Sequence, residues 1–209
     1  EKNNVISISR RKLNRKNHIN FDLLENQIDI LINNKLLSNK RIDNLIFSQR
    51  YRGKNEKNEY ELTILKVQEI IELFQKKFNT NASIVLIGSI AKNYIVNEQN
   101  SSYHITRGAL DSLVKYYAVK LGPKKIRVNA VIPDVIIKKE NLNYFNKTNK
   151  KRKLIEKITP LGRMGTSKDI SNAVGFLCQK ESNFITGQTI IVDGGLSIRG
   201  HASLSDLIN

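Results

Sequence analysis

A phenol and a permanent cation stand four residues apart at the start of an apolar helical pattern. The phenol belongs to Tyr103 and the cation to Arg107, in the stretch Ser102-Tyr103-His104-Ile105-Thr106-Arg107. Residues four apart lie on one face of a helix, so the guanidinium is expected close to the phenol ring. A nearby positive charge favours the ionised form of a phenol. The spacing therefore makes Tyr103 a candidate general acid/base.

The segment before this helix is predicted to bring a hydroxyl group to the same place. Residues 84–87 form an apolar run typical of a buried strand, and Gly88 and Ser89 follow it directly. From the end of that strand, Ser89 could hydrogen-bond a substrate carbonyl beside the phenol. The alternatives are structural: Ser89 as a helix N-cap or turn residue, and Tyr103 as a tyrosine that packs on a neighbour.

This combination resembles the signature of the short-chain dehydrogenase/reductase family, in which a serine after a strand precedes a Tyr-x-x-x-Lys motif. Ser89 and Tyr103 match, whereas Arg107 stands at the lysine position. The similarity covers residues 5–197. It continues in order through residues 118–123, 126–133, 160–163, 176–177, 185–188 and 192–195.

Apolar patterning predicts alternating strands and helices along the whole chain. Such alternation indicates a single α/β domain over residues 1–209, a Rossmann-like, doubly wound parallel sheet with helices on both faces. Residues 133–159 form a long polar stretch that we interpret as a substrate lid. The predicted strands are 5–8, 18–24, 42–47, 84–87, 126–132 and 189–192, and the predicted helices are 27–37, 59–78, 102–121 and 168–178.

One feature that the resemblance implies is not found in the sequence. Family members open with a strand and a Gly-x-x-x-Gly-x-Gly turn, whose amides hold the cofactor pyrophosphate. No glycine cluster precedes Gly53, and residues 5–8 match the family's second strand. We expect the first strand, turn and helix to lie upstream of Glu1, so that the second and fourth strands lack their shared neighbour. The alternative is a lineage that has lost cofactor binding.

The resemblance implies hydride transfer between NAD(P)H and a carbonyl or alcohol substrate. Tyr103 would exchange a proton with the substrate oxygen, and Ser89 would orient the carbonyl. Arg107 would attract the phenolate but cannot deprotonate, unlike the family's lysine. Thr63 stands at the asparagine position of the family's proton relay, where it could still bond a water.

Cofactor contacts are implied for six residues: Arg10, Asp22, Tyr103, Arg107, Pro133 and Val135. Arg10 follows the strand over 5–8, where a basic residue favours a 2′-phosphate and hence NADP over NAD. The alternatives are a surface cation for Arg10 and a helix N-cap for Asp22.

Two further segments differ from the family pattern. Residues 47–50 replace its Asn-Asn-Ala-Gly, and Asp134 replaces the glycine of its Pro-Gly. Together with Arg107, Thr63 and the lacking glycine-rich turn, these departures make a catalytically impaired member, acting as a scaffold or partner subunit, the main alternative function.

Composition and charge argue against nucleic-acid binding, a membrane span, a disulfide and a metal site. The net charge is +16, but the cations are spread along the chain and are dense only over residues 10–16 and 147–153, where no aromatic residues interleave with them, so we expect no nucleic-acid partner. A basic nucleic-acid-binding protein is the less favoured alternative function. No apolar run approaches the roughly 20 residues that cross a bilayer. The single cysteine, Cys178, excludes an internal disulfide, and the three histidines lack metal-ligand spacing. We expect a cytoplasmic protein without a membrane or metal partner. By resemblance, it would form a homodimer or homotetramer.

Overall fold

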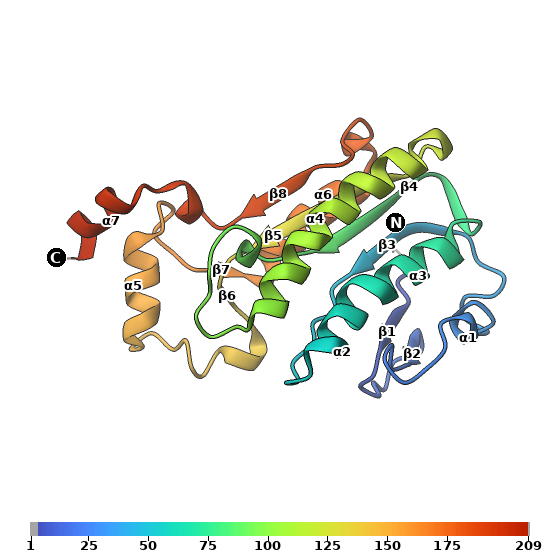
Figure 1. Ribbon diagram of the computed structural model, residues 1–209, viewed down its shortest axis with the longest axis horizontal. Helices are drawn as coiled ribbons and strands as arrows, with labels where there is room; N and C mark the ends of the chain where they lie inside the picture. The colour runs from blue at the N-terminus through green and yellow to red at the C-terminus, as the bar shows by residue number, and fades with distance from the viewer. Residues whose placement is uncertain (1–3, 209) are drawn as a thin grey trace.

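The computed structural model describes residues 4–208, and helices cover both faces of its parallel sheet (Figure 1). The strands are β1 (Ser7–Ser9), β2 (His18–Asn20), β3 (Ile42–Phe47), β4 (Phe78–Ile87), β5 (Arg127–Pro133), β6 (Ile136–Ile137), β7 (Gly165–Thr166) and β8 (Thr189–Val192). The helices are α1 (Asp29–Ile32), α2 (Glu56–Tyr60), α3 (Lys66–Phe74), α4 (Ser101–Leu121), α5 (Lys150–Ile158), α6 (Ser167–Cys178) and α7 (His201–Ile208). The predicted α/β class is confirmed.

The main sheet has the order β3-β4-β5-β8, and every neighbouring pair is parallel. In its central strands, residues 82–86 of β4 and 127–132 of β5 are continuously buried because helices cover both faces of the sheet there. β1 and β2 form a separate parallel pair, and β6 pairs with β7. Within residues 4–208, β1 pairs only with β2, and β3 pairs only with β4.

Two apolar clusters hold the helices on the sheet. On one face, α3 and α4 pack on the side chains of alternate strand residues, among them Ile84, Leu86 and Val128. On the other face, α6 packs on Val85 and Val131. The buried residues that these three helices contribute are Val67, Ile70, Ile71, Phe74, Leu110, Val114, Tyr117, Ala118 and Leu121 for the first cluster and Ile170, Val174 and Leu177 for the second.

Two predicted helices have wrong boundaries. The helix expected over 27–37 is only α1, because the Asn34 side chain accepts a hydrogen bond from the Leu36 amide and forms a turn there. The helix expected over 59–78 begins at Glu56, because Asn55 caps it, and it ends at Phe74. A π-helical turn, Glu61–Leu65, interrupts it, and β4 already begins at Phe78.

The region expected as a lid is partly ordered into short elements. Residues 133–159 contain β6, a 3₁₀ turn at Lys139–Asn141 and the helix α5. Across the described part of the chain, no helix combines the length and the apolar composition that crossing a membrane requires.

Candidate active site

Helix α4 positions the two residues from which the chemistry was predicted. Its N-cap residue Asn100 accepts a hydrogen bond from the Tyr103 amide, which fixes the first turn. Tyr103 is 8% exposed and Arg107 is 3% exposed. Both side chains are buried, and Arg107 hydrogen-bonds to Glu59 of α2. The prediction that they share one helix face is confirmed.

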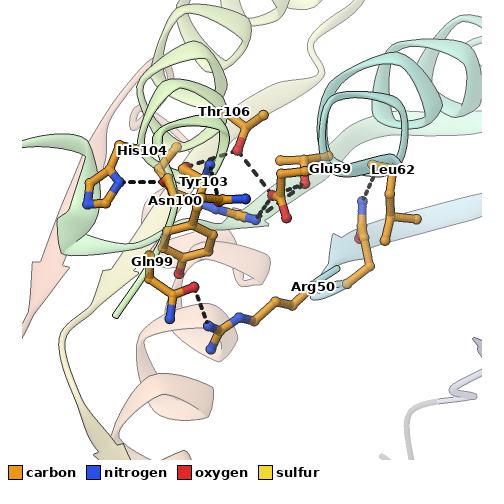
Figure 2. Close-up of polar contacts among 11 residues, drawn as sticks. Arg50, Glu59, Leu62, Gln99, Asn100, Tyr103, His104 and Thr106 are labelled. Carbon is orange, nitrogen blue, oxygen red and sulfur yellow. Dashed lines mark hydrogen bonds and ion pairs between the residues drawn. The ribbon is translucent and has the colours of Figure 1, made fainter. Parts of the chain in front are cut away.

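The Arg107 guanidinium covers the phenol ring. Its Cζ atom lies 4.6 Å from the centre of the Tyr103 ring, a cation–π contact. A second guanidinium, from Arg50 in the loop after β3, lies 5.1 Å from the same ring centre. Arg50 is held there by a hydrogen bond of 3.1 Å from its Nη2 to the Gln99 side chain (Figure 2). Tyr103 is therefore in contact with two cations.

A buried carboxylate neutralises Arg107. Glu59 in α2 is 4% exposed, and its Oε1 accepts a hydrogen bond of 2.7 Å from Arg107 Nη2. The same oxygen accepts bonds from the hydroxyls of Thr63, at 2.8 Å, and Thr106, at 3.1 Å (Figure 2). We call these four residues the Glu59 cluster. Such hydrogen bonds are what a buried ion pair requires to offset the loss of water.

Thr63, predicted as part of a proton relay, lies within the Glu59 cluster. Its hydroxyl donates to Glu59 and accepts a bond of 3.3 Å from Arg107 Nη2. Thr63 is buried within the protein, where it fixes the orientation of Arg107. The Nε of Arg107 is buried without a hydrogen-bond partner among the described residues. Arg107 is thus directed at Glu59 and at the phenol ring face.

Ser89 lies where the strand pattern predicted, directly after β4. Its Oγ accepts a hydrogen bond of 3.2 Å from the Ala91 amide and caps the 3₁₀ turn Ile90–Lys92. This is the N-cap role given above as the structural alternative. No hydrogen bond joins Ser89 to Tyr103 in residues 4–208.

Of the six predicted cofactor residues, Tyr103 and Arg107 lie in α4, and the other four lie at or just beyond strand ends. Arg10 is exposed directly after β1, and Asp22 follows β2, where its carboxylate accepts a bond from the Leu24 amide. Pro133 is the last residue of β5, and the Val135 amide donates to the Asp134 carboxylate at 2.6 Å. Burial raises the pKa of the Asp134 carboxyl. Ser89 and Pro133 end neighbouring parallel strands, so they share the carboxyl edge of the main sheet, where α/β proteins bind ligands.

A cavity of 450 Å³ opens beside Tyr103. Its wall includes Arg50, Arg52 and Lys138, three cations from the loop after β3 and the predicted lid. Burial lowers the pKa of the Lys138 ammonium, and the charges of Arg50 and Arg52 lower it further. The cavity is large enough for a small ligand.

The sequence interpretation missed Glu59, Thr106, Arg50 and Lys138. A signal existed for Glu59, because it stands four residues before Thr63 and therefore on the same helix face. The contact between Glu59 and Arg107 joins helices 48 residues apart in the chain, which spacing does not reveal. In the part of the chain that the structure describes, no three His, Cys, Asp or Glu side chains gather as metal ligands.

Comparison with known proteins gives a family match over most of the chain. A family model described as enoyl-(acyl carrier protein) reductase matches residues 24–197. A tropinone reductase homolog of Arabidopsis thaliana is 39% identical over 118 residues, which cover 56% of this chain and 44% of that protein. The match thus spans less than half the length of this relative.

Solved structures agree with this match at the level of the fold. A short chain dehydrogenase family protein from Francisella tularensis superposes with a TM-score of 0.78 at 25% identity, covering 93% of this chain and 88% of that one. A gluconate 5-dehydrogenase from Burkholderia cenocepacia, in complex with NADP, gives a TM-score of 0.72 at 22% identity, covering 88% and 76%.

Proposed function

Because this chain belongs to the short-chain dehydrogenase/reductase family, we propose that it transfers a hydride between a nicotinamide cofactor and a carbonyl or alcohol substrate. The observation that carries the proposal is the position of Tyr103. It is held at the start of α4, it borders the 450 Å³ cavity, and a guanidinium covers its ring. In the direction of reduction, the Tyr103 phenol gives its proton to the substrate oxygen as the hydride reaches the carbonyl carbon.

The surroundings of Tyr103 suit a nicotinamide cofactor. The cavity wall beside Tyr103 offers amide donors from Gln99 and Asn100, which match the ribose oxygens of such a cofactor. When bound, the cofactor would supply the hydride. We propose that Arg10, Asp22, Pro133 and Val135 hold it, and that exposed Arg10 at the end of β1 favours NADP over NAD. The relative in complex with NADP supports a nicotinamide cofactor.

Arg107 acts through Tyr103 in this proposal. A cation over the ring stabilises negative charge on the phenolate that remains after proton transfer. Its Nη2 is occupied by Glu59 and Thr63, so Arg107 holds the charge in place and does not carry a proton. Ser89, at the end of β4, is proposed to turn its hydroxyl to the substrate carbonyl when substrate is bound.

One observation favours a second function, that of a non-catalytic subunit. The family's lysine is replaced by an arginine whose charge is neutralised by buried Glu59. With this arrangement the protein would still fold but would not reduce a carbonyl substrate efficiently. In that case the functional part of the protein would be the exposed apolar face of α4, which includes Ile105, Tyr116 and Val119. This face would bind a second copy of the chain or a related chain.

Steady-state reduction of a panel of ketones with NADPH by the full-length protein tests the two functions. We expect Tyr103→Phe to lower turnover by about 10²- to 10⁴-fold, the usual contribution of general acid–base catalysis. Tyr116→Phe is the matched control, because Tyr116 lies on the exposed side of the same helix. Unchanged activity of Tyr103→Phe would show that the catalytic assignment is wrong. A folded full-length protein that turns over no ketone would support the non-catalytic function.

A further inference from the structure

The cavity beside Tyr103 gathers cations that have no acidic partner. Arg50, Arg52 and Lys138 all line it. Arg50 donates to a neutral amide, that of Gln99. Among the ion pairs formed within residues 4–208, none includes any of these three cations. None of the three cations of this wall is therefore neutralised by an ion pair of its own in the described part of the chain.

The acids on the same wall do not change this balance. Glu59 is paired with Arg107, and Glu98 accepts a bond of 3.0 Å from Lys151. Glu140 is exposed and is the remaining acid of the wall. Three cations thus face one free carboxylate across a cavity of 450 Å³.

Lys138 shows that the cations influence one another. Its pKa is lowered first by burial and then by the charges of Arg50 and Arg52, while Glu140 offsets only part of this effect. Arg50 and Arg52 are exposed and Lys138 is half-buried, and all three line one cavity, where their like charges repel one another. An anion placed among them would offset this repulsion.

We propose that this cavity binds the carboxylate or phosphate group of an anionic carbonyl substrate and so places the carbonyl beside the Tyr103 hydroxyl. The proposal rests on the proposed function for the identity of the reacting group. The binding site itself rests on Arg50, Arg52 and Lys138 together with the cavity that they line. The cavity volume suits a small ligand and not a macromolecule.

Isothermal titration calorimetry with two matched ligands tests the site directly. Acetoacetate and methyl acetoacetate share a ketone but differ in charge. We expect the acid to bind at least about tenfold more tightly, since a hydrogen bond to a charged group is worth a factor of about ten or more. Dihydroxyacetone phosphate and dihydroxyacetone repeat the comparison for a phosphate group. The charged ligand that binds more tightly, acetoacetate or dihydroxyacetone phosphate, shows whether the site prefers a carboxylate or a phosphate.

Single substitutions distinguish anion binding at this cavity from non-specific attraction of anions to a basic protein. Lys138→Gln and Arg52→Gln should each weaken binding of the preferred anion by about tenfold. Lys180→Gln should leave it unchanged, because Lys180 follows Gln179, whose carbonyl accepts a bond from Arg127 at the opposite, amino end of β5. Arg52 is exposed, so its replacement leaves the packed core untouched.

The outcomes distinguish this proposal from the proposed function. Equal binding of acid and ester for both ligand pairs, or an equal loss in Lys180→Gln, would overturn the anion site. Tyr103→Phe should abolish turnover yet retain binding of the preferred anion. Tight anion binding without turnover would contradict the proposed function alone, and turnover of neutral ketones without preference for an anion would contradict the anion site alone.

Discussion

Arg107 donates from its Nη2 to the buried Glu59 carboxylate at 2.7 Å, while its Cζ lies 4.6 Å from the centre of the Tyr103 ring. One side chain thus joins a structural ion pair to the candidate catalytic phenol. Because Glu59 comes from α2 and Arg107 from α4, the pair also connects two helices. Changes at Glu59 are therefore expected to affect both stability and the environment of Tyr103.

We predict that Glu59→Gln lowers the free energy of unfolding by about 3–5 kcal/mol, because it leaves Arg107 buried without a counter-charge. Chemical denaturation followed by circular dichroism measures this loss. Glu98→Gln is the control, since Glu98 forms an exposed ion pair with Lys151 and should matter far less. The double variant Glu59→Gln/Arg107→Met should recover much of the loss. If Glu59→Gln costs no more than Glu98→Gln, the Glu59 cluster does not stabilise the fold.

Much of the fold could be predicted from local patterns. Residues 42–47 and 189–192 were expected as strands and are β3 and β8, and the expected helix over 102–121 is α4 to within one residue. These elements follow apolar periodicity because one or both of their faces are buried. Helix boundaries failed where side-chain hydrogen bonds decide them, as with Asn34 after α1 and Asn55 before α2. Two strand predictions also had wrong bounds, since the strand expected over 84–87 is the longer β4 and the strand expected over 18–24 is the shorter β2.

The candidate site was predictable only in part. Spacing within one helix revealed the contact between Tyr103 and Arg107, since helix geometry fixes it. Spacing could not reveal that Arg50 and Glu59 converge on the same two residues, because those contacts depend on how α2 and the loop after β3 pack against α4. The sequence alone therefore does not reveal that Glu59 neutralises the charge of Arg107.

A second ion-pair centre predicts a pH-dependent stability. Burial of the Asp111 carboxyl opposes its ionisation, but hydrogen bonds from Lys92, Thr189 and Lys115 outweigh burial and hold its pKa well below the usual range. The first two bonds, of 2.8 Å from Lys92 and 2.5 Å from Thr189, join α4 to the turn after β4 and to β8. A depressed pKa in the folded state contributes stability above the unfolded-state value and loses it as the pH falls.

We therefore predict that Asp111→Asn lowers the free energy of unfolding at pH 7 by about 1.5–3 kcal/mol, the worth of hydrogen bonds to a charged group. The difference from the wild type should shrink as the pH falls below about 4, the ordinary value for an aspartate in an unfolded chain. Denaturant titrations at pH 7, 5 and 3 measure it. Glu25→Gln, at an exposed position, is the control. A difference that is constant with pH would contradict the assigned role of the Asp111 charge.

The outer face of α4 is predicted to be a contact between copies of the chain. Ile105 and Tyr116 are each 55% exposed and Val119 is 80% exposed, and their spacing places them on one side of the helix. We expect Val119→Glu to shift a dimer or tetramer to monomers in size-exclusion chromatography with light scattering. Ile30→Glu, at an exposed apolar residue of α1, is the matched control. A wild-type chain that is monomeric at all concentrations tested would contradict the prediction.

Arg107→Lys tests whether the arginine limits proton movement at Tyr103. Lysine keeps the charge that pairs with Glu59 but lacks the planar fork that lies over the ring, and its ammonium can exchange a proton, which a guanidinium cannot. We expect carbonyl reduction with NADPH to become faster, with little change in KM for the ketone. The gain should vanish in Tyr103→Phe/Arg107→Lys, because both effects depend on the same phenol. Slower turnover in Arg107→Lys would show instead that the arginine over the ring is the functional group, and that the cation–π contact stabilises the phenolate better than a mobile ammonium does.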